Sequence, residues 1–126
     1  MKNGIYVYGV IKTSASQKFG EIGIGDKNSQ VLTIGFKDLA AVVSNSPFMV
    51  YDSLAKEKTI KDLVTHQFVI EKVMEGFTII PVKFGTMVET EDEIIKLMEK
   101  GYFVLRNALR KMEGKVELDV VAGWKL

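Results

Sequence analysis

The sequence predicts an α+β domain, a modified ferredoxin-like α/β sandwich with a mostly antiparallel sheet and two long helices on one face. Segments rich in β-branched and aromatic residues, which favour strands, alternate with turn signals. Two longer segments repeat apolar residues every three or four positions, and such amphipathic helices need a sheet to cover. The expected order is β-β-β-α-β-α-β, and we expect residues 1–126 to form one domain.

The composition is that of a neutral, cysteine-free chain. It has 126 residues, of which 47% are hydrophobic, and its 17 basic and 16 acidic side chains leave a net charge of +1. Without cysteine there is no disulfide, thiol nucleophile or cysteine-based zinc site. The neutral charge argues against a nucleic-acid partner, and no run reaches the roughly 20 apolar residues of a membrane helix. We therefore expect a cytoplasmic protein with neither nucleic acid nor membrane as its partner.

The first third of the chain is expected to form only strands and loops. Residues 5–11 are almost continuously apolar, which predicts a central strand buried on both faces. Residues 13–25 contain three glycines and indicate an irregular loop. Residues 30–36 and 39–44 are expected to pair as a hairpin.

The first helix is expected to begin at a cap on Asp52 or Ser53 and to run to about Glu75, before Gly76. Apolar residues at helical spacing form its predicted core face: Ile60, Leu63, Val64, Ile70 and Met74. Charged residues form its predicted outer face: Lys58, Lys61, Asp62 and Lys72.

The second helix is expected to begin at Thr90, which forms a capping box with Glu93, and to end at Gly114. Its predicted core face is apolar throughout: Ile94, Leu97, Met98, Leu105, Ala108, Leu109 and Met112. Residues 115–124 then alternate apolar and polar side chains, which predicts a last strand.

The stretch from His66 to Gly85 joins the first helix to a predicted strand at residues 77–84. Pro81 cannot donate a ladder hydrogen bond, so we expect a break in sheet pairing there, with Lys83 turned toward solvent or a partner. His66 is the only histidine, and no nucleophile or carboxylate constellation accompanies it. We therefore expect no catalytic residue, cofactor or metal site, and a loss of about 1 kcal/mol for His66→Ala.

The spacing of apolar residues leaves two aromatic residues without a predicted place in the core. Phe103 points away from the predicted core face of its helix, and Trp124 stands almost at the end of the sequence. Both are candidates for an interaction surface. The alternatives are that Phe103 is simply one of the many single exposed apolar residues of proteins and that Trp124 closes the core.

Several stretches together resemble the family of gas vesicle proteins F and L, in its N-terminal domain. The family motif corresponds to a helical histidine followed by a strand with an unusual proline: His66, Pro81, Lys83, Phe84 and Gly85. The stretches YVYGV at 6–10, DLAAVVS at 38–44 and KVEL at 115–118 resemble other landmarks of the family, in the same order. Members are usually longer and carry a second α+β domain.

The resemblance implies a non-enzymatic accessory or minor component of gas vesicles. Such a protein assists vesicle assembly, contacts the hydrophobic shell protein and other accessory proteins, and is associated with vesicles in the cytoplasm. With a net charge of +1 we expect the contact to be apolar and nearly independent of salt. The alternative is a ferredoxin-like small-molecule-sensing or interaction module. The partner surface, the oligomeric state and the choice between chaperone and shell component stay open at this stage.

Overall fold

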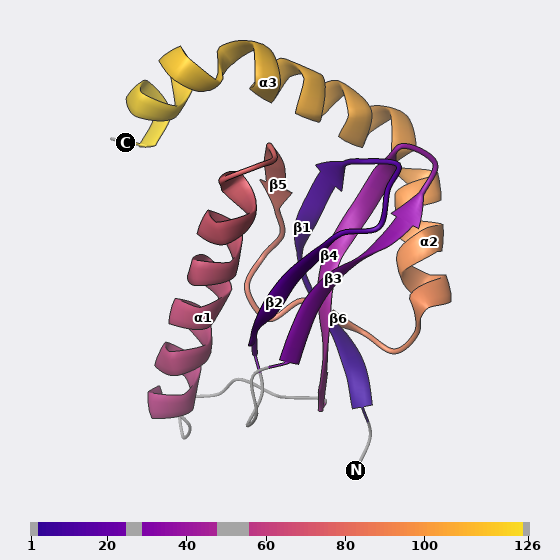
Figure 1. Cartoon of the computed structure of the whole chain (residues 1–126), viewed down its shortest axis with the longest axis vertical. Coiled ribbons are helices and arrows are strands. Elements are labelled where there is room, and N and C mark those ends of the chain that lie inside the picture. Colours follow the sequence, from indigo (N-terminus) through magenta and orange to yellow (C-terminus); the bar gives the residue numbers. More distant parts are fainter. Residues whose placement is uncertain (1–2, 25–28, 48–55, 125–126) are drawn as a thin grey trace.

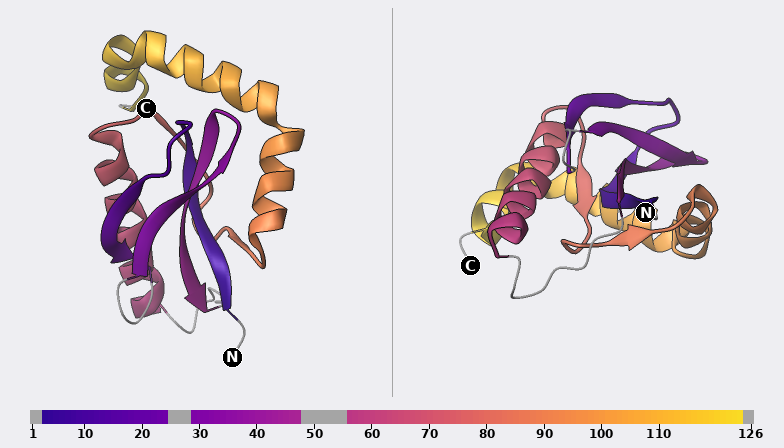
Figure 2. Two further views of the ribbon diagram at one scale, coloured as in Figure 1. Left: turned by 45° about the vertical axis from the view of Figure 1, so that its right-hand side comes forward. Right: turned by 90° about the horizontal axis from the view of Figure 1, so that it is seen from below.

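The structure is a computed structural model that describes residues 3–24, 29–47 and 56–124, with side chains described up to residue 113. A curved sheet stands between helix α1 and helix α2, and helix α3 crosses one end of it (Figure 1). The α+β class and the antiparallel sheet are confirmed. The predicted position of the helices on one face is wrong, because α1 and α2 pack on opposite faces, as the view from below also shows (Figure 2).

Six strands form the sheet: β1 Asn3–Lys12, β2 Lys18–Gly23, β3 Ser29–Phe36, β4 Leu39–Pro47, β5 Ile79–Pro81 and β6 Met87–Val88. Their order is β2-β3-β4-β1-β5, with β6 also paired to β1. The predicted hairpin is confirmed as β3 and β4, joined by a tight turn in which Lys37 has φ 54°. The predicted loop at residues 13–25 is wrong, because it contains the edge strand β2, which accommodates Gly20 at an irregularity.

Strand β1 is the centre of the fold and is buried on both faces, as predicted. Its residues alternate between two core clusters, so that Val7 faces α2 and Tyr6 faces α1. The register shifts between Val7 and Gly9, which makes a bulge at Tyr8. A Cβ at Gly9 would lie 2.5 Å from the carbonyl oxygen of Ile80, so only glycine allows β5 to approach β1 this closely.

Three helices complete the described chain: α1 Lys56–Met74, α2 Glu91–Lys100 and α3 Tyr102–Trp124. The cap at Thr90 is confirmed, since its Oγ1 accepts a hydrogen bond from the backbone N–H of Glu93 at 3.3 Å. The predicted second helix is divided at Gly101. The predicted strand at residues 115–124 is wrong, because α3 continues through Gly114 to Trp124. The predicted caps at residues 52 and 53 lie outside the described residues.

The predicted faces of the helices are partly wrong. In α1 only Ile70 of the predicted core face is buried, and the helix buries a different set: Asp62, His66, Val69, Ile70 and Val73. In α2 and α3, Ile94, Met98 and Leu109 are buried as predicted, whereas Leu97 and Met112 are exposed. Among the described residues, no helix combines the length and the apolar character needed to span a membrane.

Candidate functional site

Three of the five predicted motif residues, His66, Phe84 and Gly85, meet around Tyr6 in an aromatic cluster between β1 and α1. The hydroxyl of Tyr6 lies 2.8 Å from Nδ1 of His66 and accepts a hydrogen bond from the backbone N–H of Gly85 at 2.9 Å. Because Gly85 supplies the proton of one bond, the Tyr6 hydroxyl is free to donate its own proton to His66. Tyr6 is fully buried, so both bonds form in a poorly solvated interior.

Tyr8, two positions further along β1, also has a hydroxyl with two hydrogen-bond partners. Its hydroxyl accepts a hydrogen bond from the backbone N–H of Ile24 at 2.9 Å and lies 2.7 Å from Oγ of Ser44. The rings of Tyr6 and Tyr8 are 4.8 Å apart and each lies 5.7 Å from the ring of His66. Two tyrosines two positions apart on a buried strand indicate that partners for their hydroxyls exist elsewhere in the chain, and the prediction from sequence did not use this signal.

Burial determines the protonation of this cluster. It lowers the pKa of His66, although a hydrogen bond to the backbone of Val82 acts in the opposite direction. Burial also raises the pKa of Tyr6 and Tyr8. At neutral pH the imidazole and both hydroxyls are therefore uncharged. A neutral His66 that accepts from Tyr6 at Nδ1 carries its proton on Nε2.

The remaining motif residues position the loop that closes the cluster. Pro81 ends the edge strand β5 opposite Gly9, and Lys83 is exposed. The ring of Phe84 packs edge-on against His66, with centroids 5.6 Å apart. Gly85 has φ 89°, a conformation that other residues rarely adopt, and this aims its N–H at Tyr6. The unusual sequence from Pro81 to Gly85 therefore attaches the loop after β5 to β1 and α1.

This cluster has the properties of a structural joint. His66, Tyr6 and Tyr8 are buried, and each is hydrogen-bonded to another part of the chain. In the part of the chain that the structure describes, no group of three or more histidine, aspartate or glutamate side chains is placed to hold a metal ion.

Helix α1 turns an apolar face outward, away from this cluster. Ile60 and Val64 are 61% and 63% exposed, and Phe68, one turn further, is 50% exposed. The exposed residues of this face, here called the α1 stripe, are Ile60, Leu63, Val64, Phe68 and Met74. Four of them, all but Phe68, were assigned to the core face by the sequence pattern, which also included Ile70. The apolar face therefore exists, but it is turned toward solvent and not toward the core.

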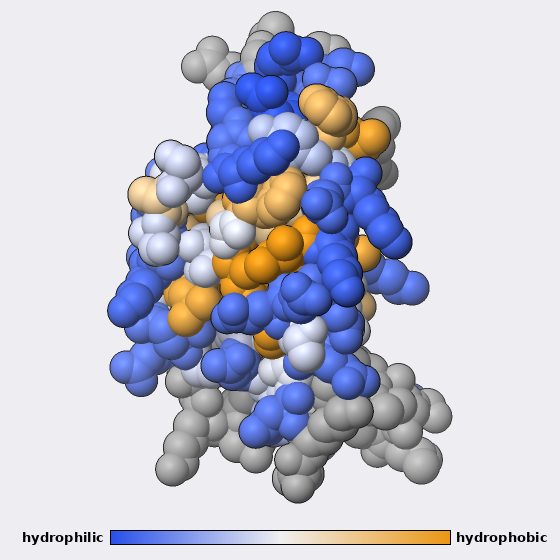
Figure 3. Space-filling model, turned by 90° about the vertical axis from the view of Figure 1, so that its right-hand side faces the viewer, coloured by the Kyte–Doolittle hydropathy of each residue, from blue (hydrophilic) through white to orange (hydrophobic). Residues whose placement is uncertain are grey.

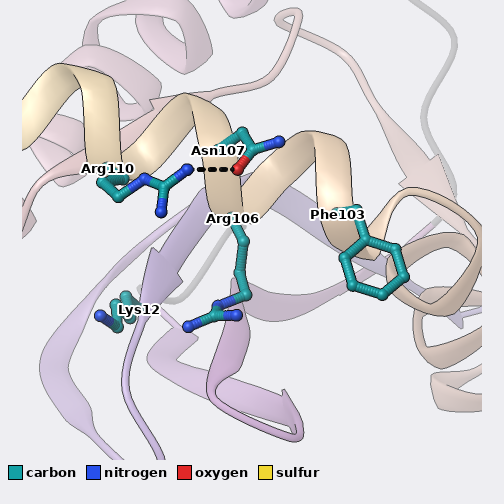
Figure 4. Close-up of a pocket in the computed structure, with 5 residues that line it drawn as sticks. All are labelled: Lys12, Phe103, Arg106, Asn107 and Arg110. Atoms are coloured by element: carbon teal, nitrogen blue, oxygen red, sulfur yellow. Dashed lines mark hydrogen bonds between the residues drawn. The ribbon is translucent and has the colours of Figure 1, made fainter.

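Phe103 lies on the other side of the sheet and is 75% exposed, in keeping with its predicted outward direction. Figure 3 shows apolar surface on the side of α2, framed by polar residues. Phe103 also borders a small pocket lined by Lys12, Arg106, Asn107 and Arg110 (Figure 4). The second candidate, Trp124, ends α3, and its side chain lies outside the described residues.

The corner next to this pocket is fixed by Asp38, in the turn between β3 and β4. Its carboxylate accepts a hydrogen bond from the hydroxyl of Tyr102 and forms an ion pair with Arg106, whose Nε lies 3.1 Å away. The bond from Tyr102, assisted by Arg106 and Lys12, lowers the pKa of Asp38. Lys37 lies over the ring of Tyr102, 5.0 Å from its centroid. The start of α3 is thus tied to the hairpin by contacts that a sequence pattern does not reveal.

The fold and these sites define an α+β domain built around a structural aromatic cluster, with apolar surface left exposed. The family model described as gas vesicle synthesis protein GvpL/GvpF matches residues 4–126. The chain therefore belongs to the gas vesicle protein family of GvpL and GvpF, as the resemblance implied.

Individual relatives agree with this assignment. The chain is 32% identical over 123 residues to gas vesicle protein F of Haloferax mediterranei, a match that covers 95% of this chain and 54% of that protein. It is 30% identical over 120 residues to gas vesicle protein F of a Streptomyces species, covering 93% of this chain and 47% of that protein. The chain thus spans about half the length of the curated relatives it matches.

A solved structure supports the fold. The crystal structure of the gas vesicle protein GvpF from Anabaena sp. PCC7120 superposes with a TM-score of 0.63 at 20% identity. The superposition covers 88% of this chain and 44% of the Anabaena chain.

Proposed function

We propose that this chain is a non-enzymatic assembly factor of gas vesicles that contacts the hydrophobic shell protein through the α1 stripe. Family membership supports the general role. The observation that carries the contact is the exposure of Ile60 and Val64, at 61% and 63%, next to the half-exposed Phe68. Contiguous exposed apolar surface on a soluble domain marks an interaction site, and a shell protein that is itself apolar fits such a surface.

The aromatic cluster supports the non-enzymatic part of the proposal. A general base needs a reacting proton within reach, whereas His66 is buried and bonded to Tyr6, a residue whose raised pKa keeps it protonated. Through Tyr6, His66 links α1 to β1 and to the loop at Gly85, which is a structural role. Catalysis is therefore not the role we propose for it.

Within the part of the chain that the structure describes, the pocket beside Phe103 gives little support to the alternative of a small-molecule-sensing module. The pocket beside Phe103 holds about 50 Å³, whereas sites for drug-sized ligands usually measure roughly 300–1,000 Å³. A pocket of this size accommodates the tip of a side chain, not a free metabolite.

The proposal is tested by capturing the shell protein with the purified chain. Replacing Ile60, Val64 and Phe68 together by serine is expected to weaken capture by about thirtyfold, the equivalent of one interface hot spot of ~2 kcal/mol. The matched control replaces Leu97 and Val104, exposed apolar residues on the opposite side, and is expected to change capture little. Raising the salt concentration is expected to change capture by the α1 stripe less than about twofold, because the contact is apolar.

Phe103 receives its own variant in the same assay, because the sequence singled it out as an interaction candidate. Capture that survives the serine variant of the α1 stripe and disappears with Phe103→Ala would move the contact to the other side of the sheet. Failure to capture the shell protein at all, with the chain folded, would refute the proposed contact.

A further inference from the structure

The pocket beside Phe103 gathers more positive charge than its surroundings neutralise. Figure 4 shows Arg106 extending from α3 toward Lys12 at the end of β1, with Arg110 one turn further along the helix. Two elements that are distant in sequence therefore bring three cationic side chains to one pocket of about 50 Å³. This local charge contrasts with the net charge of +1 for the whole chain.

The existing bonds account for only part of this charge. Asp38 pairs with Nε of Arg106 at 3.1 Å, which leaves the two terminal nitrogens of that guanidinium as donors. Arg110 donates from Nη2 to Oδ1 of Asn107 at 2.9 Å, and this neutral acceptor holds the side chain without compensating its charge. Lys12 is exposed at the pocket, where it contributes to the lowered pKa of Asp38. Among the side chains that the structure describes here, three cations thus face the one carboxylate of Asp38.

The donors present are suited to one kind of group. The Asn107 amide nitrogen and the remaining guanidinium nitrogens are all donors, and charge-assisted bonds from arginine to a carboxylate are among the stronger polar contacts. Phe103 borders the same pocket and is 75% exposed, so the rim beside the cations is apolar. A ligand that satisfies both features has an acidic group next to an apolar one.

We infer that this pocket binds an acidic peptide segment of a protein partner, with a carboxylate between Lys12, Arg106 and Arg110 and an apolar side chain against Phe103. The volume of about 50 Å³ suits a side-chain tip better than a whole free ligand. A nucleic acid is disfavoured, because a phosphate backbone needs an extended basic track and the pocket has one short cluster. The inference does not depend on the shell protein, whose proposed contact lies on the opposite side of the sheet.

The test uses a soluble peptide of alternating glutamate and leucine, titrated into the isotopically labelled chain and followed by amide chemical shifts. We expect shifts centred on residues 12 and 103–110. Lys12→Gln and Arg110→Gln are each expected to weaken binding about threefold, in line with exposed ion pairs. Lys111→Gln is the matched control, with the same loss of charge from an exposed residue of α3 that does not line the pocket, and it is expected to have little effect.

Two further arms separate the parts of the inference. Raising the salt to roughly 0.3 M shortens the screening length to about 6 Å and is expected to weaken peptide binding severalfold. Phe103→Ala is expected to weaken binding of the glutamate–leucine peptide but not of a glutamate–alanine peptide. Thermal unfolding of each variant establishes that the fold is retained.

Several outcomes would overturn the inference. A glutamine–leucine peptide that binds as well as the glutamate peptide would show that charge is not recognised. Inorganic phosphate that saturates the same shifts and displaces the peptide would make this a site for free anions. A short oligonucleotide that binds more tightly than the peptide, or no peptide binding at all, would also refute it.

Discussion

The two faces of the sheet are packed by different chemistry. Toward α2 and α3 the core is aliphatic, with Val7, Ile94 and Met98 among its members. Toward α1 it contains Tyr6 and Tyr8 beside valines and isoleucines. The Tyr6 hydroxyl bonds across the interface to His66 of α1, whereas the Tyr8 hydroxyl bonds to Ser44 of the neighbouring strand β4. On the first side α2 buries the apolar residues Ile94 and Met98, and its charged residues are exposed together with Leu97. On the second side α1 buries Asp62 and His66 while the α1 stripe faces solvent.

Burial in α1 does not follow the hydropathy of the helix alone, since His66 is buried where it bonds to the Tyr6 hydroxyl of β1. A buried tyrosine hydroxyl without a partner costs about 1–3 kcal/mol, so α1 turns His66 toward Tyr6. Asp62, one turn earlier on the same face, is buried and paired with Lys58 at 2.9 Å. The apolar residues of the α1 stripe are then left outside, which fits a helix that serves both the core and a partner.

The largest effect is expected from removing the imidazole that directs α1. His66→Ala should lower the free energy of unfolding by about 3 kcal/mol, because it leaves a cavity among aromatic rings and deprives Tyr6 of its partner. This exceeds the loss of about 1 kcal/mol expected from the sequence, where one hydrogen bond was counted. Urea unfolding measures it, with Gln67→Ala, an exposed neighbour, as the control. A loss no larger than that of the control would mean that the cluster does not direct α1.

A smaller effect is expected from removing only the hydroxyl at the centre of the cluster. Tyr6→Phe keeps the ring but leaves Nδ1 of His66 and the N–H of Gly85 without their partner, at a cost of about 2 kcal/mol. Tyr102→Phe is the matched change on the opposite side, where Tyr102 and its bond to Asp38 are only partly buried, and its effect should be much smaller. Equal effects of the two changes on urea unfolding would remove the distinction between the faces.

The fold could be predicted from the sequence where each residue acts through local geometry. Thr90 and Glu93 form the expected cap, the β3–β4 hairpin is in place, and β1 is central. The direction of α1 could not be predicted in this way, because it depends on bonds between residues 6 and 66 that no local pattern contains. The helical continuation of α3 was missed because the alternation of residues 115–124 favours a strand. The break at Gly101 was missed because apolar residues keep helical spacing on both sides of it.

The site was predictable to the same limited degree. Phe103 was identified as an outward aromatic residue, and its exposure agrees with that. Its basic surroundings were not foreseen, because Lys12 and Arg106 are far apart in sequence and a net charge of +1 hides the local excess. From the sequence, salt-independent binding was expected of Phe103 and Trp124. We now expect it of the α1 stripe, whereas binding at the Phe103 pocket is expected to weaken with salt.

A pH dependence follows from the same asymmetry. The pKa of His66 is lowered by burial, so below its usual value of about 6.5 the unfolded chain binds a proton more readily than the folded chain. Stability from this group is therefore complete above about pH 6.5 and is lost as the pH falls toward the lowered pKa. Urea unfolding at several pH values between roughly 5 and 7.5 measures it. The difference in slope between the wild type and His66→Ala should isolate this group, and identical slopes would contradict it.

The smallest effect on folding is expected where hydropathy alone predicts a large one. Ile60→Ser with Val64→Ser should change the free energy of unfolding by about 0.5 kcal/mol or less per residue, because both side chains are already more than half exposed. Serine and valine also have similar helix propensities. The control on the same helix is Val69→Ser with Val73→Ser, both fully buried, which should cost several kcal/mol in total by burying unpaired hydroxyls and leaving cavities. If the exposed pair proves as costly as the buried pair, the α1 stripe is packed within this domain. If it is nearly silent in folding yet reduces capture of the shell protein, its apolar residues are kept for a partner, because the fold itself has no use for them.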